Sequence, residues 1–168
     1  MSHENGKGIY VASNLLQYKR VRHTNNVLRD HGVEITYDWT PHAEELFASD
    51  APDNRPEEEL CEIGLNEVRG VAQAQFLLVL LPGGRGTHFE LGQAYQKFSD
   101  ELTVQFRQEG WEDYRNCAFE TLPICVVMGQ DDAPFRTSFH YLHDIYRVQT
   151  DDEGIDRALT YFDIERKT

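Results

Sequence analysis

The sequence contains few cysteines and no long hydrophobic run. Its three cysteines, Cys61, Cys117 and Cys125, are odd in number, and none belongs to a C-x-x-C pair. This usage argues against a disulfide framework and against a zinc knuckle of paired cysteines. No apolar stretch approaches the roughly 18 residues that cross a bilayer, and the first residues, MSHENGKG, do not resemble a signal peptide. We therefore expect a cytoplasmic protein without a membrane partner.

Basic residues are also scarce. The chain has 16 lysines and arginines against 29 aspartates and glutamates, which gives a formal net charge of −13. A charge of this sign repels nucleic-acid polymers and anionic membrane surfaces. A small anionic ligand is compatible with it only where local groups oppose the overall field.

The length and the pattern of apolar residues predict the fold. A chain of 168 residues, 40% of them hydrophobic, suits one core, so we treat 1–168 as a single domain. Short β-branched or aromatic runs alternate with segments of helical periodicity. We expect strands at 8–13, 33–39, 76–81, 124–128 and 145–148, and helices at 21–31, at 42–48, from 56 and from 87. A last helix should follow Asp151 and Asp152, which we expect to cap it. This alternation predicts an α/β fold, a flavodoxin-like or Rossmann-like parallel sheet of about five strands flanked by helices.

Ligands of such sheets bind at the carboxyl ends of the strands. Two known phosphate-binding motifs are absent here, G-x-x-x-x-G-K-[ST] and G-x-G-x-x-G. The third predicted strand leads instead into a glycine loop that enters a helix, an arrangement that presents backbone N–H groups to an anion. The candidate ligand-binding residues at this edge are Ser13, Asn14, Asp38, Trp39, Gly83, Gly84, Arg85 and Gly86.

Glu90 lies just behind this loop and has two interpretations. Thr87 and Glu90 form the pattern T-x-x-E, which is typical of a capping box at a helix N-terminus. The same carboxylate also lies at the expected ligand edge. Gly92, inside the predicted helix, favours a ligand or packing role because glycine there costs up to about 1 kcal/mol relative to alanine.

Three segments resemble the nucleoside 2-deoxyribosyltransferase superfamily, which includes deoxynucleoside 5′-monophosphate N-glycosidases. They are GIYVAS at 8–13, LLPGG at 80–84 and GTHFELGQA at 86–94. The resemblance implies cleavage or transfer at the N-glycosidic bond of a nucleoside or a nucleoside 5′-monophosphate. It assigns Glu90 as the nucleophile that attacks the anomeric carbon and Tyr10 as the residue that holds this carboxylate and the sugar. It also implies a homo-oligomer, a dimer or larger, and no organic cofactor.

The nearby helix N-terminus predicts that Glu90 stays ionised at neutral pH. Thr87 and His88 follow the glycine loop, so we count them with Arg85 among the candidate substrate contacts. The resemblance implies that Ser138 lies in a loop that can reach a neighbouring subunit's site, and an ordinary surface loop is the alternative. The family usually carries an aspartate that helps the base to leave, whereas this chain has Gln75 at the matching Ala-Asp pair. Glutamine can bind a base but cannot donate a proton as a carboxylic acid does. Asp38 and His88 are the alternative acids expected from their loop positions.

Two other functions remain open. A TIR-like NAD glycohydrolase uses a glutamate in a similar fold, and a non-catalytic nucleotide-binding module would explain Gln75. A metal site is not expected. His140 and His143, beside Asp144, could share a helical face, but no third ligand lies at a convincing spacing from the two histidines.

Overall fold

The structure, a computed structural model, describes residues 6–48, 55–109, 123–129, 140 and 145–166. The strands are β1 (Gly8–Ala12), β2 (Glu34–Ile35), β3 (Phe76–Leu80), β4 (Ile124–Val127) and β5 (Tyr146–Val148). The helices are η1 (Leu15–Gln17), α1 (Tyr18–Asp30), α2 (Thr40–Ala48), α3 (Glu57–Gln73), α4 (Arg85–Glu109) and α6 (Asp151–Tyr161). In these ranges no helix combines the length and the apolar character that crossing a membrane would require.

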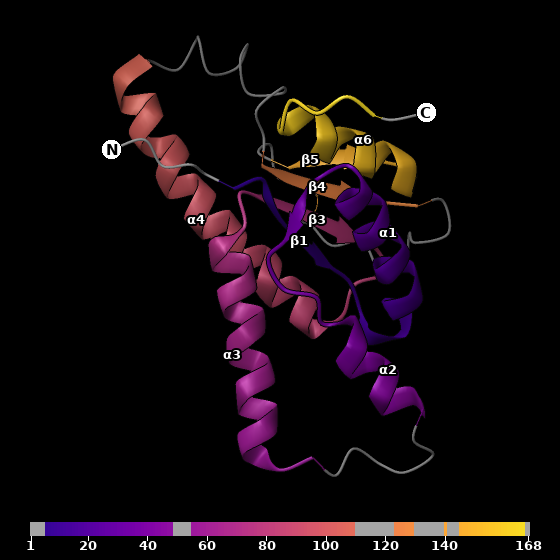
Figure 1. Cartoon of the computed structure of the whole chain (residues 1–168). Helices are drawn as coiled ribbons and strands as arrows, with labels where there is room; N and C mark the ends of the chain where they lie inside the picture. The colour runs from indigo at the N-terminus through magenta and orange to yellow at the C-terminus, as the bar shows by residue number, and fades with distance from the viewer. Residues whose placement is uncertain (1–5, 49–54, 110–122, 130–139, 141–144, 167–168) are drawn as a thin grey trace.

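The five strands form one parallel sheet in the order β2-β1-β3-β4-β5. This is the flavodoxin-like order, so the predicted fold class is confirmed. Helices α1 and α6 cover one face of the sheet, and the long helices α3 and α4 run side by side on the other (Figure 1). The strand order reverses between β1 and β3, which is where ligands of this fold bind.

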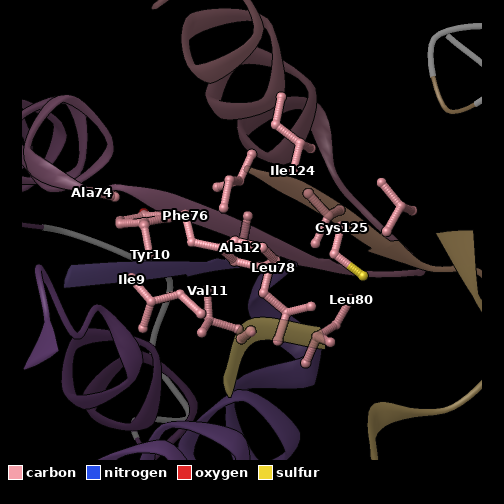
Figure 2. Close-up of a cluster of buried hydrophobic side chains, with 14 of the residues drawn as sticks. Ile9, Tyr10, Val11, Ala12, Ala74, Phe76, Leu78, Leu80, Ile124 and Cys125 are labelled. Atoms are coloured by element: carbon pink, nitrogen blue, oxygen red, sulfur yellow. The ribbon is translucent and has the colours of Figure 1, made fainter. Parts of the chain in front are cut away.

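The central strands are buried on both faces. Every residue of β1, β3 and β4 is buried, which explains why the runs GIYVA, FLLVL and ICVV lack polar alternation. Figure 2 shows the resulting core, with Ile9 and Val11 on one side of β1 and Tyr10 on the other. Tyr10 therefore points toward the layer formed by α3 and α4.

The second strand is shorter than predicted. Only Glu34 and Ile35 pair with β1, because the Thr36 hydroxyl then binds the carbonyl oxygens of Ile9 and Gly70 and the chain leaves the sheet. Helix α1 begins at Tyr18 rather than at Val21, after a turn of 3-10 helix. Its predicted end is confirmed, since Gly32 follows it with a φ of +79°.

The cap of the last helix differs from the prediction by one residue. Thr150, not Asp151 or Asp152, is the N-cap of α6, and its hydroxyl accepts from the Glu153 N–H at 3.2 Å. The Glu153 carboxylate accepts from the Thr150 N–H in return at 2.9 Å. A capping box therefore lies at 150–153, whereas the sequence suggested one at 87–90.

Candidate active site

The T-x-x-E pattern at 87–90 does not form a capping box. Helix α4 begins at Arg85, so Thr87 lies inside its first turn and its hydroxyl accepts from the Gly84 N–H at 2.9 Å. Glu90 belongs to the second turn, beyond the N–H groups that need caps. The capping interpretation of Glu90 is therefore wrong.

Glu90 instead binds a residue of the central sheet. The Tyr10 hydroxyl donates to Glu90 Oε1 at 2.5 Å, and both side chains are buried, with Glu90 7% exposed. A buried carboxylate is costly unless it is hydrogen-bonded, and one phenol meets only part of that need. The contact that the resemblance implies between Tyr10 and Glu90 is present.

Burial decides the protonation of this pair. Loss of hydration raises the pKa of Glu90 to about 7, although the Tyr10 hydrogen bond lowers it and the charge of Glu67 raises it further. The prediction that the helix N-terminus keeps Glu90 fully ionised at neutral pH is thus corrected. Burial also raises the pKa of Tyr10, with the charge of Glu90 as the next cause, so the phenol stays a donor.

Glu67 is a second carboxyl group at this site and was missed in the sequence. It lies on α3, lines the same cavity as Glu90, and has a pKa raised by burial. The signal was present, because Glu67 falls at helical spacing from Ile63, Gly70 and Ala74 on the side of α3 that faces the sheet. A carboxyl group on the side of a helix that faces the core is unusual and marks a candidate functional residue.

Gly70 allows α3 to approach the sheet one turn after Glu67. A Cβ atom there would lie 2.5 Å from Cβ of Tyr37 and 3.0 Å from the Tyr10 ring. The Cβ atom of any other residue would clash at this position. Gly92 has no comparable explanation, since nothing lies within 4 Å of the position of its Cβ.

A cavity of about 420 Å³ opens at the carboxyl ends of β1 and β3. It contains most of the predicted ligand-binding residues: Ser13, Asn14, Trp39, Gly84, Arg85, Gly86, Thr87 and Glu90. Leu15, Leu16 and Glu67 complete its lining. The structure thus brings together residues from the ends of β1 and β3, from α3 and from α4.

Hydrogen bonds fix the wall of this cavity. Ser13 Oγ donates to the Leu80 carbonyl at 2.7 Å, and Asn14 Nδ2 donates to the Pro82 carbonyl at 2.8 Å. The Trp39 indole N–H donates to the Val11 carbonyl at 2.9 Å, which holds the ring beside the end of β1. These contacts join the loop after β1 to the loop that precedes α4.

Asp38 and His88, the two acids expected from the sequence, lie outside the cavity lining. Asp38 pairs with Arg29 at 2.7 Å and accepts from the Thr40 N–H, so it caps α2. Although burial opposes them, these hydrogen bonds leave the pKa of Asp38 below its ordinary value, which is the wrong direction for a proton donor. His88 Nδ1 lies 2.7 Å from the Gly84 carbonyl, and its ring packs against His140. Neither side chain lines the cavity.

Gln75 lies at the opposite edge of the sheet. Its Oε1 accepts from the Gly8 N–H at 2.8 Å and its Nε2 donates to the Gln73 carbonyl at 3.0 Å. It therefore joins the amino ends of β1 and β3, and its assignment as a substrate-binding residue is corrected. Gly83 also lies outside the cavity lining and packs against Thr87. Ser138 lies outside the described residues.

A second cavity of about 350 Å³ lies between α3 and α4. It shares Glu67, Gly86 and Glu90 with the first, and its other walls include Leu65, Val68 and Phe89. Phe89 is 64% exposed. The two carboxyl groups thus line both cavities.

Comparisons with protein families, with curated proteins and with solved structures found no match to this chain.

Proposed function

We propose that the protein cleaves or transfers the N-glycosidic bond of a nucleoside or a nucleoside 5′-monophosphate. The observation that carries this proposal is Glu90, a buried carboxylate that Tyr10 holds at the edge of a cavity. Cleavage of such a bond passes through an oxocarbenium-like transition state. A carboxylate beside the anomeric carbon stabilises that state and can capture it covalently.

Glu90 and Glu67 divide the two tasks of the reaction. Ionised Glu90 attacks the anomeric carbon while the bond to the base breaks and its electron pair moves to the base nitrogen. Protonated Glu67 gives its proton to that nitrogen, so the base leaves neutral. Water or a second base then attacks the anomeric carbon and releases Glu90, and the proton of the incoming nucleophile returns to Glu67.

Burial raises the pKa values of both carboxyl groups, that of Glu90 to about 7. A fraction of the pairs therefore holds one proton near neutral pH, and in the reactive form this proton is on Glu67. The Tyr10 hydrogen bond favours this form, because it stabilises the Glu90 carboxylate against the larger effect of burial. Because the charge of Glu67 acts on Glu90, the two carboxyls titrate as a pair. Glu67 supplies the acid that was sought at Gln75.

The lining of the larger cavity suggests how a nucleotide would lie. Arg85 and the first N–H groups of α4 offer positive potential for a 5′-phosphate. Trp39, Leu15 and Leu16 offer apolar surface for the base. In that orientation the anomeric carbon lies between these ends, where Glu67 and Glu90 line the cavity.

We also propose a homo-oligomer, as the resemblance implies. Leu65 and Val68 on α3 and Phe89 on α4 are exposed around the second cavity, beside both carboxyl groups. Apolar side chains gathered in this way indicate a contact surface. Light scattering of the purified protein measures the assembly.

A substrate panel tests the proposed function. The protein is incubated with nucleosides, their 5′-monophosphates and NAD, with and without an acceptor base, and the products are separated by chromatography. We expect free base, or an exchanged nucleoside when an acceptor is present. Release of nicotinamide from NAD without action on nucleosides would indicate a NAD glycohydrolase instead. Tight nucleotide binding in calorimetry without any released base would indicate a binding module.

A further inference from the structure

The segment after β2 brings an aromatic and a basic side chain to the inner side of α3. The Tyr37 ring stacks on the His42 imidazole of α2, with 6.3 Å between ring centroids and 29° between the planes. Cβ of Tyr37 in turn lies against Gly70, one helical turn from Glu67. The stack thus fixes His42 beside the part of α3 that carries Glu67.

The ionisable groups around Glu67 come from every neighbouring element. Tyr10 belongs to β1, Tyr37 follows β2, His42 belongs to α2 and Glu90 belongs to α4. Arg85, also on α4, lines the same cavity. Of these groups, His42 is the one whose positive charge opposes the effect of burial on the pKa of Glu67. Glu67, in turn, raises the pKa of Tyr37 after burial.

We propose that His42 is a positioning residue that acts through Glu67, stabilising the carboxylate that remains after Glu67 has protonated the leaving base. This inference rests on the proposed function. No proton moves between His42 and Glu67 in this role: the proton goes from Glu67 to the base nitrogen, and the positive charge of His42 compensates the negative charge left behind. When the incoming nucleophile returns a proton to Glu67, that charge is removed again.

The orientation of His42 follows from its packing on Tyr37. Because the rings stack, the imidazole can be replaced by a phenyl ring that keeps the contact and removes the charge. His42→Phe therefore separates the electrostatic role from packing, and His42→Gln removes both. His23→Gln, at an exposed position of α1, serves as the matched control.

The test is a titration of the Glu67 carboxyl carbon by NMR, assigned by the loss of its signal in Glu67→Gln. We expect the Glu67 midpoint to move to higher pH in both His42→Phe and His42→Gln, since each removes a positive charge that favours the carboxylate. We expect it to stay in place in His23→Gln. The alkaline limb of the pH–rate profile for base release should move in the same direction, and the rate at its plateau should fall because the acid is weaker.

Three results would be decisive. A Glu67 midpoint that is unchanged in both His42 variants overturns the inference and leaves the proposed function standing. Lower activity in His42→Gln alone, with a normal pH profile in His42→Phe, also overturns it, because the role of His42 would then be packing. Wild-type protein that releases no base from any substrate overturns the proposed function, whatever the titration shows.

Discussion

Tyr10 on β1 and Glu90 on α4, 80 positions apart in the sequence, share a hydrogen bond of 2.5 Å inside the core. The phenol donates to the carboxylate while both are largely removed from water. Burial raises the pKa of Glu90 to about 7, and the phenol donor opposes this rise because it stabilises the carboxylate.

Tyr10→Phe should weaken catalysis and change its pH dependence. The substitution keeps the buried ring but removes the donor, so the pKa of Glu90 rises further and less of it is ionised at neutral pH. Because hydrogen bonds to charged groups contribute about 1.5–3 kcal/mol, we expect kcat/KM to fall roughly 10- to 100-fold. The acid limb of the pH–rate profile should move upward. Tyr18→Phe on α1 is the control, and an unmoved acid limb in Tyr10→Phe would refute the role of the phenol.

The stability of the fold should depend on the titration of Glu90. Its pKa rises from 4.5 to about 7 on folding, so between these values the folded state binds more protons than the unfolded chain. Stability from this group is therefore present below about pH 4.5 and is lost as the pH rises to about 7. The loss is on the order of 3 kcal/mol.

Glu90→Gln removes this dependence and keeps an acceptor for Tyr10. We expect the variant to gain stability relative to the wild type as the pH rises from 5 to 8, measured by urea unfolding at each pH. A difference between the two proteins that is independent of pH would contradict the raised pKa of Glu90.

Glu67→Gln should remove the proton donor and leave the nucleophile in place. General acid catalysis contributes typically 10²- to 10⁴-fold, so we expect base release to slow by about that factor. A deoxyriboside whose leaving group needs no proton should be cleaved at a rate close to that of the wild type. Equal losses on both kinds of substrate would show that Glu67 supports the fold or the binding of the sugar instead.

Gly70→Ala should destabilise the protein and disturb the site. The new methyl group would lie 2.5 Å from Cβ of Tyr37, and overpacking of this kind costs typically about 1–3 kcal/mol. Gly92→Ala, where nothing lies within 4 Å, should instead stabilise α4 by up to about 1 kcal/mol. Urea unfolding measures both. A Gly70→Ala variant as stable as Gly92→Ala would mean that α3 does not pack as closely as the structure shows.

The sheet could be predicted from the sequence because each of its central strands is an uninterrupted run of apolar residues. Strands β1, β3 and β4 are buried on both faces, and no polar residue interrupts their runs. The end of the edge strand β2 could not be predicted in this way. Its end is set by the hydroxyl of Thr36, which binds a carbonyl of α3, and only the folded chain brings the two together.

The sequence predicted the site residues that directly follow a strand. It did not predict those whose position depends on a contact between distant parts of the chain. Ser13, Asn14 and Trp39 line the cavity because they follow β1 and β2, as the strand pattern indicated. Whether the T-x-x-E pattern forms a cap depends on where α4 begins and on Tyr10, which no local spacing reveals. Glu67 lies at the site because α3 packs closely on the sheet, and Gly70 permits this close packing.

The most direct test of Glu90 as the nucleophile compares Glu90→Gln with the wild type in the release of free base from the best substrate of the panel. Both proteins are first shown by circular dichroism and urea unfolding to be folded. We predict that the wild type releases base, that quenching during turnover traps a deoxyribosyl adduct on Glu90 in mass spectra, and that Glu90→Gln shows neither. A folded Glu90→Gln protein that releases base at the wild-type rate would contradict this prediction.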